Sequence, residues 1–474
     1  MKDLDAWLKN ISHQQQPDEH CPLLTKITVN VARFVLGAVL VFSGYVKAVD
    51  PLGSSYKLED YEEALGLAGA VPGDLLLAAS IALATLEFCV GIFLLFAIQR
   101  RRTSVLALLF MAAMTAISIW LVAANPVKDC GCFGDAIHLT NGQSLAKNIV
   151  LLVCAVLLWR HPAAMYRFIS KSNQWIAINY VLLFAVLTSL WSLYDLPIFD
   201  FRPYHVGVNI KKAMEIPPGA PQPKFETTFI LEKKGVRKEF TLDNYPDSTW
   251  TFIDSKTVQT APGYVPPISD FYIQDAQGNN VTDELLNRKG YVFLLISPSL
   301  AHADDSNFGA IDQIYEYCQD QHVPFYCLTA SPKKDIDQWQ DMTGAEYPFL
   351  FGDATVLKTI IRSNPGLMLI KDGTIIGKWS HNFLPDMAGA DKPLAQTETG
   401  QAHPAPLAKT LGEVLLWFFM PLLGLTAADR LWAWTKWLRR WRQKREKQLF
   451  IFSHKDKKGQ NNEKENRSRQ LENE

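Results

Sequence analysis

Six long apolar stretches constrain the fold of this chain more than any other feature. A helix that crosses a membrane needs about 20 mostly apolar residues. The chain of 474 residues has stretches of this kind at 27–46, 75–98, 104–124, 144–159, 175–194 and 411–425. Any one of them would fit a buried helix of a soluble core, but a set of six favours membrane-spanning helices. We therefore predict a polytopic α-helical membrane protein with a four-helix transmembrane bundle and two further helices.

The positions of the basic residues predict how these helices are oriented. Short loops rich in Lys and Arg stay on the cytoplasmic side of a membrane. Such residues occur at 100–102, within 160–171 and from Arg430 onward, and six crossings put all three segments on one side. Both termini are then expected in the cytoplasm and the polar stretch 195–409 outside. The first 26 residues show no cleavable signal peptide, so the first apolar helix is expected to direct insertion.

The composition excludes several other classes of protein. Lys and Arg number 47 against 48 Asp and Glu, whereas a nucleic-acid binder is usually basic, so no nucleic-acid partner is expected. Seven cysteines are too few for a fold built on disulfides and too dispersed for a structural zinc site. No cluster of His, Cys and carboxylate residues has the spacing of metal ligands, so we predict no metal site.

The external stretch is expected to hold a second domain. Residues 195–269 are rich in Pro and read as a linker with one β-hairpin, formed by strands at 224–230 and 236–242. From residue 270 onward strands and helices alternate, and a hairpin around Lys371-Asp372-Gly373 closes the pattern. We predict strands at 291–296, 323–328, 367–370 and 375–379 and helices at 308–319 and 336–342. This order indicates an external α/β domain over 270–386.

The α/β stretch resembles a known family. Its order of elements, with Asn364-Pro365 before the final hairpin, is similar to the thioredoxin-like domains of the membrane-tethered, periplasmic TlpA type. The resemblance implies that Pro365 is cis and faces the active site. It also implies a Cys-x-x-Cys pair after the first central strand, but the corresponding segment 297–304 has no cysteine. Cys318 and Cys327 fall late in a helix and within a strand, where inert buried thiols are expected. We predict a thioredoxin-like domain that has lost its dithiol chemistry and docks a partner protein.

Two cysteines stand close together in the loop between the third and fourth apolar helices. Cys130 and Cys132 lie in the sequence Asp-Cys-Gly-Cys-Phe-Gly-Asp, which the predicted topology places outside, where disulfides persist. Cysteines two positions apart can close a small, strained ring, and strain makes a disulfide easier to reduce. The pair is our candidate redox site. A rigid loop with a static disulfide or with free thiols is the alternative.

The first four helices resemble two families of membrane proteins. Residues 27–159 are similar to the DoxX and methylamine-utilisation MauE families in these features: Ser43-Gly44, Lys47, Asp50-Pro51, Glu87, Gly91, Cys-Gly-Cys-Phe-Gly and Asn148. The resemblance implies a part in redox steps of the bacterial cell envelope, including the maturation of disulfide-rich partners. It places the protein in the inner membrane, with the α/β domain in the periplasm.

Glu87 is a candidate site residue because it lies within an apolar helix. A carboxylate at mid-membrane costs a few kcal/mol, so such a residue faces the bundle interior or a partner. A proton route or a quinone-site acid is one interpretation, and an internal hydrogen bond is the other. Lys47 lies near the outer end of its helix and Glu87 about halfway along the next, so no direct pair is expected. Cys89 and Cys154 are expected to pack between helices. Cys21 is expected in the cytoplasm, where it cannot reach Cys130.

The C-terminal segment is expected to lie on the membrane surface. Basic residues from Arg430 onward interleave with Trp432, Trp434, Trp437 and Trp441, a pattern typical of an amphipathic helix on anionic lipid. The tail after Lys455 is almost wholly polar and is expected to be disordered. The predicted domains are therefore 1–26, 27–160, 175–194, 195–269, 270–386, 387–410, 411–427 and 428–474.

Two functional hypotheses follow. In the first, the protein belongs to thiol–disulfide metabolism of the envelope, with Cys130 and Cys132 exchanging disulfides with a periplasmic partner, Glu87 as an intramembrane acid and a quinone as the candidate electron acceptor. In the second, it is a non-catalytic membrane-anchored protein that binds or assembles envelope components. Replacing both cysteines by serine abolishes activity under the first hypothesis and leaves partner binding unchanged under the second.

Overall fold

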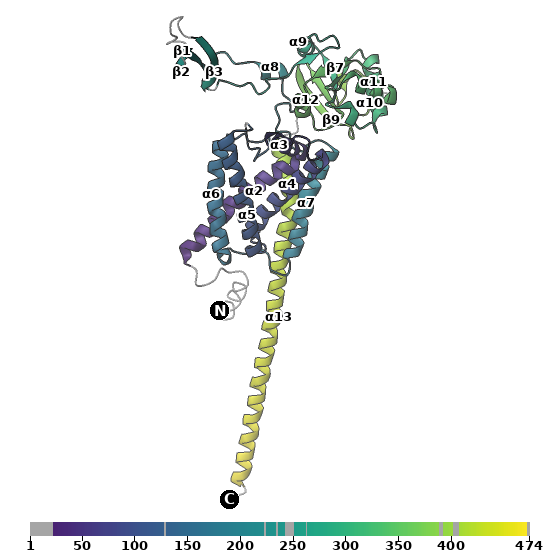
Figure 1. Cartoon of the computed structure of the whole chain (residues 1–474). Coiled ribbons are helices and arrows are strands. Elements are labelled where there is room, and N and C mark those ends of the chain that lie inside the picture. Colours follow the sequence, from purple (N-terminus) through teal and green to yellow (C-terminus); the bar gives the residue numbers. More distant parts are fainter. Residues whose placement is uncertain are drawn as a thin grey trace. The chain divides into compact units, whose positions relative to one another are not determined.

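The computed structural model of the chain describes residues 22–127, 129–221, 224–233, 236–241, 251–261, 263–387, 392–401 and 407–471 (Figure 1). The chain divides into two units. One unit comprises Met1–Ser192 together with Ala405–Glu474, and the other comprises Leu193–Pro404. The first holds the long apolar helices and the second holds the sheets.

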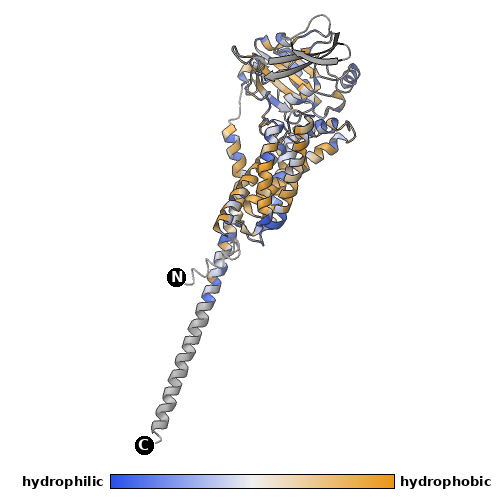
Figure 2. Ribbon diagram, turned by 60° about the vertical axis from the view of Figure 1, so that its left-hand side comes forward, coloured by the Kyte–Doolittle hydropathy of each residue, from blue (hydrophilic) through white to orange (hydrophobic). Residues whose placement is uncertain are grey.

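Among the described residues, six helices are long and apolar enough to cross a membrane. They are α2 (Leu23–Val49), α4 (Gly73–Phe96), α5 (Arg100–Ala124), α6 (Asn141–Arg160), α7 (Gln174–Tyr194) and the first part of α13 (Leu407–Leu471). Figure 2 shows the apolar residues concentrated along these helices. All six predicted apolar stretches are confirmed as helices, so the chain is a multi-pass membrane protein.

Close contact between α2 and α4 depends on glycine. A Cβ atom added to Gly44 would lie 2.4 Å from the backbone nitrogen of Phe88, and one added to Gly91 would lie 2.7 Å from that of Val41. No side chain larger than hydrogen fits at either position without moving a helix. Small residues of this kind let two membrane helices approach until their backbones touch. The contact brings the C-terminal half of α2 against the middle of α4.

The short helix α3 (Pro51–Ala64) is a feature that the sequence analysis did not predict. Asp50 begins it, because its side chain accepts a hydrogen bond from the backbone N–H of Gly53, and Pro51 occupies the first helical position. The helix is too polar to span a membrane, and a search for apolar stretches therefore passes over it. It lies between α2 and α4 in the chain and covers the cysteine loop.

The last two membrane helices pack against α4. Val181 and Ala185 of α7 and Phe418 and Leu422 of α13 are buried in one apolar cluster with Phe88 of α4. The rings of Phe184 and Phe418 have centroids 4.6 Å apart. At the basic end of the same helices, Asp429 accepts hydrogen bonds from the backbone and hydroxyl of Ser170 and from Asn173. Contacts at both ends therefore fix α13 beside α7.

The structure differs from the sequence prediction along α13. A membrane helix at 411–425, a surface helix and a disordered tail after Lys455 were expected, but one continuous helix runs from Leu407 to Leu471. It passes through Pro421. Beyond residue 427 the helix contains no proline and a single glycine, Gly459, so the sequence has no strong signal to end it.

The second unit contains a six-stranded mixed sheet with the order β4-β7-β6-β5-β8-β9. Its strands are β4 (Ile273–Gln274), β5 (Tyr291–Ser297), β6 (Phe325–Thr329), β7 (Phe349–Gly352), β8 (Gly366–Lys371) and β9 (Thr374–Ser380). β5, β6 and β7 run parallel, whereas β4, β8 and β9 pair antiparallel. The predicted α/β domain is thus confirmed as a mixed sheet covered by helices.

Both faces of this sheet are buried, which explains why β5 is an unbroken apolar run. Phe293 and Leu295 point into a cluster with α10 (Phe308–Asp320) and α11 (Lys333–Thr343). Leu294 and Ile296 point into the opposite cluster, which includes α9 (Thr282–Asn287), α12 (Ala354–Ile360) and Ile210 of α8 (Ile210–Met214).

A separate three-stranded sheet precedes the α/β domain. β1 (Lys224–Lys233) is central and pairs antiparallel with β2 (Val236–Thr241) and β3 (Thr251–Ala261). The predicted hairpin of two strands is confirmed, although its turn at 234–235 lies outside the described residues. The third strand was not predicted.

Candidate functional site

Cys130 and Cys132 meet in the loop between α5 and α6. Their Sγ atoms are 2.6 Å apart, and the two residues are 6% and 5% exposed. Gly131 between them has φ +61°, a left-handed conformation that favours glycine. A Cβ atom there would also lie 3.2 Å from Cγ of Lys57. The loop therefore turns sharply enough to bring the two sulfurs together, as the spacing predicts.

The unpredicted helix α3 holds this loop from one side. The hydroxyl of Tyr61 donates a hydrogen bond of 2.7 Å to the carbonyl oxygen of Cys130. One turn earlier on the same face of α3, the ammonium of Lys57 lies 3.1 Å from a carboxylate oxygen of Asp129. These contacts fix the first half of the loop and cover the sulfurs, so α3 is part of the site.

Helix α2 holds the loop from the membrane side. The hydroxyl of Ser43 donates a hydrogen bond of 2.5 Å to the carbonyl oxygen of Cys132. The ammonium of Lys47 donates to the same hydroxyl oxygen over 3.3 Å. One turn of α2 thus connects the backbone of Cys132 to a buried positive charge.

Lys47 pairs directly with Glu87, so the expectation that they would not meet is wrong. Lys47 Nζ and Glu87 Oε2 are 2.7 Å apart, and the residues are only 7% and 3% exposed. The prediction measured depth along each helix separately. It did not allow for the close contact at Gly44, which brings the C-terminal half of α2 to the level of Glu87. Pairing offsets the cost of placing each charge in an apolar bundle.

A small cavity joins the cysteine loop to this ion pair. Ser43, Glu87, Cys132, Lys147 and Asn148 are among the residues that line it, and its volume is about 10 Å³. That volume suffices for about one water molecule. Polar groups therefore continue from the sulfur of Cys132 into the bundle as far as Glu87.

Lys147 adds a second positive charge near the sulfurs. Its ammonium lies 4.3 Å from the centre of the Phe133 ring, which follows Cys132 in the chain. The neighbouring Asn148 donates hydrogen bonds to Ser118 and to the carbonyl oxygen of Met114, which ties α6 to α5. The start of α6 is itself fixed by a capping box between Thr140 and Gln143.

The two thiols are electrostatically unequal. The hydrogen bond from Cys130 lowers the pKa of Cys132 to about 6, against the effect of burial and with further help from Lys147 and Lys47. The same hydrogen bond, together with burial, raises the pKa of Cys130 above its usual range. Because the thiolate is the nucleophilic form of cysteine, this electrostatic difference favours Cys132 over Cys130 as a nucleophile.

The other predicted cysteines do not contribute to this site. Cys89 is buried in α4, Cys154 is partly buried in α6, and Cys21 lies outside the described residues. In the α/β domain, burial raises the pKa of Cys318 to about 12 and that of Cys327 further. Among the residues that the structure describes, no group of His, Cys, Asp and Glu side chains is placed to hold a metal ion.

The segment 297–304 of the α/β domain carries polar groups in place of cysteines. Ser297 donates a hydrogen bond of 2.7 Å to the side-chain oxygen of Asn364, and Asn364 donates one of 2.8 Å to the carbonyl oxygen of Ser299. The Asn364–Pro365 peptide bond is cis, as the resemblance implied. A short 3-10 turn, η3 (Leu300–His302), follows β5 at the position where the resemblance implied the Cys-x-x-Cys pair.

Sequence reasoning missed three functional neighbours of the cysteines: Lys57, Tyr61 and Lys147. The first two stand four residues apart, the spacing that puts side chains on one face of a helix. This spacing could have predicted that both side chains face the same way, but only if the segment had first been recognised as the helix α3.

Two segments of the chain match models of known protein families. Residues 25–161 match the family model of methylamine utilisation protein MauE. Residues 225–261, which include most of the three-stranded sheet, match a domain of unknown function, DUF8463. No curated protein matches the chain, and no solved structure does. The MauE match contains every residue of the site described above. Over residues 25–161, the N-terminal membrane-helical part of this chain is therefore similar to the MauE family.

Proposed function

We propose that the protein carries out thiol–disulfide exchange with a partner protein through Cys130 and Cys132. The observation that carries the proposal is the pairing of two sulfurs 2.6 Å apart, of which one has a pKa lowered to about 6. A static structural disulfide has no need of this electrostatic difference. Lys47 and Lys147 supply the positive charge that favours the thiolate of Cys132.

The exchange balances as two displacements. The thiolate of Cys132 attacks a disulfide of the partner, which forms a mixed disulfide and releases one partner thiolate that takes up a proton. Cys130 then loses its proton and attacks the sulfur of Cys132, which releases the second partner thiol and leaves a Cys130–Cys132 disulfide. The partner gains two electrons and the pair loses two. Run in reverse, the same steps oxidise a partner dithiol.

The ion pair of Lys47 and Glu87 supports a proton route in this proposal. Each exchange step releases or takes up a proton at a buried sulfur, and the small cavity connects Cys132 with Glu87. The cavity has no room for a quinone ring, so we assign Glu87 to proton transfer. A quinone in the surrounding lipid remains our candidate acceptor of the two electrons and two protons of the dithiol, which would restore the disulfide and yield a hydroquinone.

We further propose that the α/β domain has a thioredoxin-like fold and docks the partner. A sheet with central parallel strands and a closing antiparallel hairpin supports the fold assignment. The lack of a cysteine in 297–304 leaves recognition as its role. In this proposal the protein lies in a bacterial inner membrane, with both termini in the cytoplasm and the cysteine loop and the α/β domain in the periplasm.

A trapping experiment tests the exchange. In Cys130→Ser, Cys132 can attack a partner but nothing can resolve the adduct, so a mixed disulfide should accumulate on non-reducing gels and vanish with reductant. Cys132→Ser is the matched control and should trap far less, because burial still raises the pKa of the remaining thiol. If neither variant forms an adduct while partner binding persists, the non-catalytic, membrane-anchored role is correct. Labelling with a membrane-impermeant thiol reagent tests the proposed orientation.

A further inference from the structure

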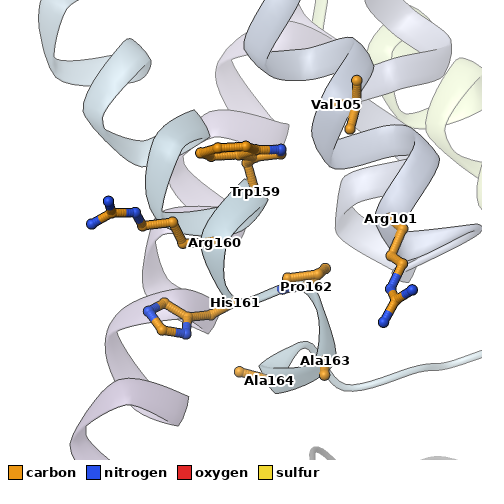
Figure 3. Close-up of a pocket in the computed structure, with 8 residues that line it drawn as sticks. All are labelled: Arg101, Val105, Trp159, Arg160, His161, Pro162, Ala163 and Ala164. Carbon is orange, nitrogen blue, oxygen red and sulfur yellow. The ribbon is translucent and has the colours of Figure 1, made fainter.

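A pocket of about 450 Å³ opens between the first turn of α5 and the last turn of α6, on the basic end of the bundle. Figure 3 shows the ring of Trp159 reaching from α6 toward Val105 on α5. Arg101 projects downward from the start of α5, and Arg160 projects from α6 on the side turned away from α5. The short 3-10 turn η1 (Pro162–Ala164) closes its far end.

The floor of this pocket is held in place by hydrogen bonds. The guanidinium of Arg100 donates to the carbonyl oxygens of Ala163 and Met165 over 2.8 and 2.6 Å. The amide of Asn30 on α2 donates to the carbonyl oxygen of Ala164 over 3.1 Å. Two helices therefore position the turn that follows α6, and the pocket is formed before any ligand enters.

The lining residues favour an anionic ligand with an apolar tail. Arg101, Arg160 and His161 line the pocket together with Trp159 and Val105, and no lining residue is acidic. Arginine binds phosphate oxygens through two parallel N–H donors. Tryptophan is enriched at the depth of lipid headgroups. The volume lies within the range of about 300–1,000 Å³ that small-molecule sites have.

An apolar surface continues from the pocket along both helices. Leu109, one turn beyond Val105 on α5, is 63% exposed. Val156, one turn before Trp159 on α6, is 37% exposed. A free phosphate ion would make no use of this surface, whereas an acyl chain would lie along it.

We propose that this pocket binds the phosphodiester headgroup of an anionic phospholipid. On binding, the exposed side chains of Arg101 and Arg160 turn toward the phosphate oxygens, Trp159 packs on the glycerol region, and the acyl chains follow α5 and α6. Basic pockets between membrane helices are known to select such headgroups. The site is separate from the cysteine loop and does not depend on the exchange chemistry.

Native mass spectrometry of the full-length protein in detergent tests the proposal, with cardiolipin, phosphatidylglycerol and phosphatidylcholine as added lipids. We expect the first two to bind and phosphatidylcholine to bind at least about tenfold more weakly, because only the first two carry net negative charge. Arg101→Gln/Arg160→Gln should weaken cardiolipin binding by about tenfold or more. The matched control Arg102→Gln/Lys171→Gln removes the same charge from exposed residues outside the pocket and should change binding less than about twofold.

A second variant tests the cavity without changing the charge. Val105→Trp should fill the pocket and reduce cardiolipin binding, whereas Val153→Trp, at an exposed position on α6 outside the pocket, should not. Unchanged melting temperatures without lipid establish that the variants are folded. Equal losses in pocket and control variants would overturn the proposal, as would equal binding of phosphatidylcholine. Displacement of cardiolipin by millimolar inorganic phosphate would assign the site to a free anion and would overturn it as well.

Discussion

The cysteine loop and the segment after β5 are two sites of opposite chemical character in one chain. The loop brings two sulfurs within 2.6 Å under positive charge from Lys47 and Lys147. The segment 297–304 follows a buried strand at the position where the resemblance implies a dithiol, yet it contains serines that hydrogen-bond to the amide of Asn364. The comparison teaches that the fold of a domain and its reactivity are separate properties. In this chain the paired thiols lie with the membrane helices, and the segment after β5 carries none.

The largest expected effect comes from removing the reactive pair. Cys130→Ser/Cys132→Ser should abolish single-turnover reduction of a disulfide-linked fluorogenic peptide by the pre-reduced protein, because no other described thiol has a lowered pKa. The matched variant Cys318→Ala/Cys327→Ala in the α/β domain should retain the full rate. If only the Cys318→Ala/Cys327→Ala variant loses the reaction, the reactive thiols lie in the α/β domain and not in the cysteine loop.

The next largest effect concerns the ion pair beneath the loop. Lys47→Met should destabilise the protein by about 3–5 kcal/mol, because it leaves the carboxylate of Glu87 buried without its partner. Unfolding in mixed detergent micelles measures this change. Lys47→Met/Glu87→Leu removes both charges and should recover most of the stability. If the double variant is as unstable as Lys47→Met, the loss of stability does not come from an unpaired buried charge, and this explanation is wrong.

The pH dependence of alkylation sharpens the contrast between thiols. Since the pKa of Cys132 is about 6 and that of Cys318 about 12, the reaction of Cys132 with iodoacetamide should rise through pH 6 and level off above pH 7. Near pH 7 its thiolate fraction should exceed that of an ordinary cysteine by about thirtyfold. Mass spectrometry of peptides from the reduced, full-length protein reports both rates. Identical pH profiles for the two thiols would contradict the electrostatic difference.

The smallest expected effect lies in the α/β domain. Burial raises the pKa of Asp200, but Lys378 and Arg202 outweigh it and hold the pKa well below its usual range. The ion pairs therefore stabilise the folded state above the ordinary pKa of about 3.8, and this stability is lost as the pH falls below it. Between pH 5 and pH 3 the loss should be about 1 kcal/mol, because Asp200 takes up most of a proton over that interval in the unfolded chain but stays ionised in the folded protein. Hydrogen exchange of β8 and β9 peptides at pH 5 and pH 3 measures it, and Asp200→Asn should reduce the difference.

The fold was predictable where a single physical pattern extends over many residues. Apolar length alone located all six membrane helices, and the unbroken run from Tyr291 to Ile296 identified the central strand β5. The helix α3 escaped because its side chains are neither continuously apolar nor regularly alternating. The continuous helix α13 was not predicted, because its polar C-terminal part was judged by low hydrophobicity alone. The helix propensity of the residues in that part was not considered.

The site was predictable only in its local part. The spacing of Cys130 and Cys132 sets the distance between the sulfurs, so the sequence was enough to identify the pair. The contact between Lys47 and Glu87 depends on how two helices cross, which involves residues 40 positions apart. The same holds for Tyr61 and the carbonyl of Cys130, which are 69 positions apart. Such contacts follow from tertiary packing and have no signature within a short window of sequence.

Gly44 makes the whole site intolerant of a single methyl group. Because a Cβ atom there would meet the backbone of Phe88 at 2.4 Å, even alanine would force α2 away from α4. Ser43, next to Gly44, and Lys47, one turn later on α2, would move with the helix, and the carbonyl of Cys132 would lose its donor Ser43. One glycine of α2, through the residues that it positions, thus controls how the backbone of Cys132 is held.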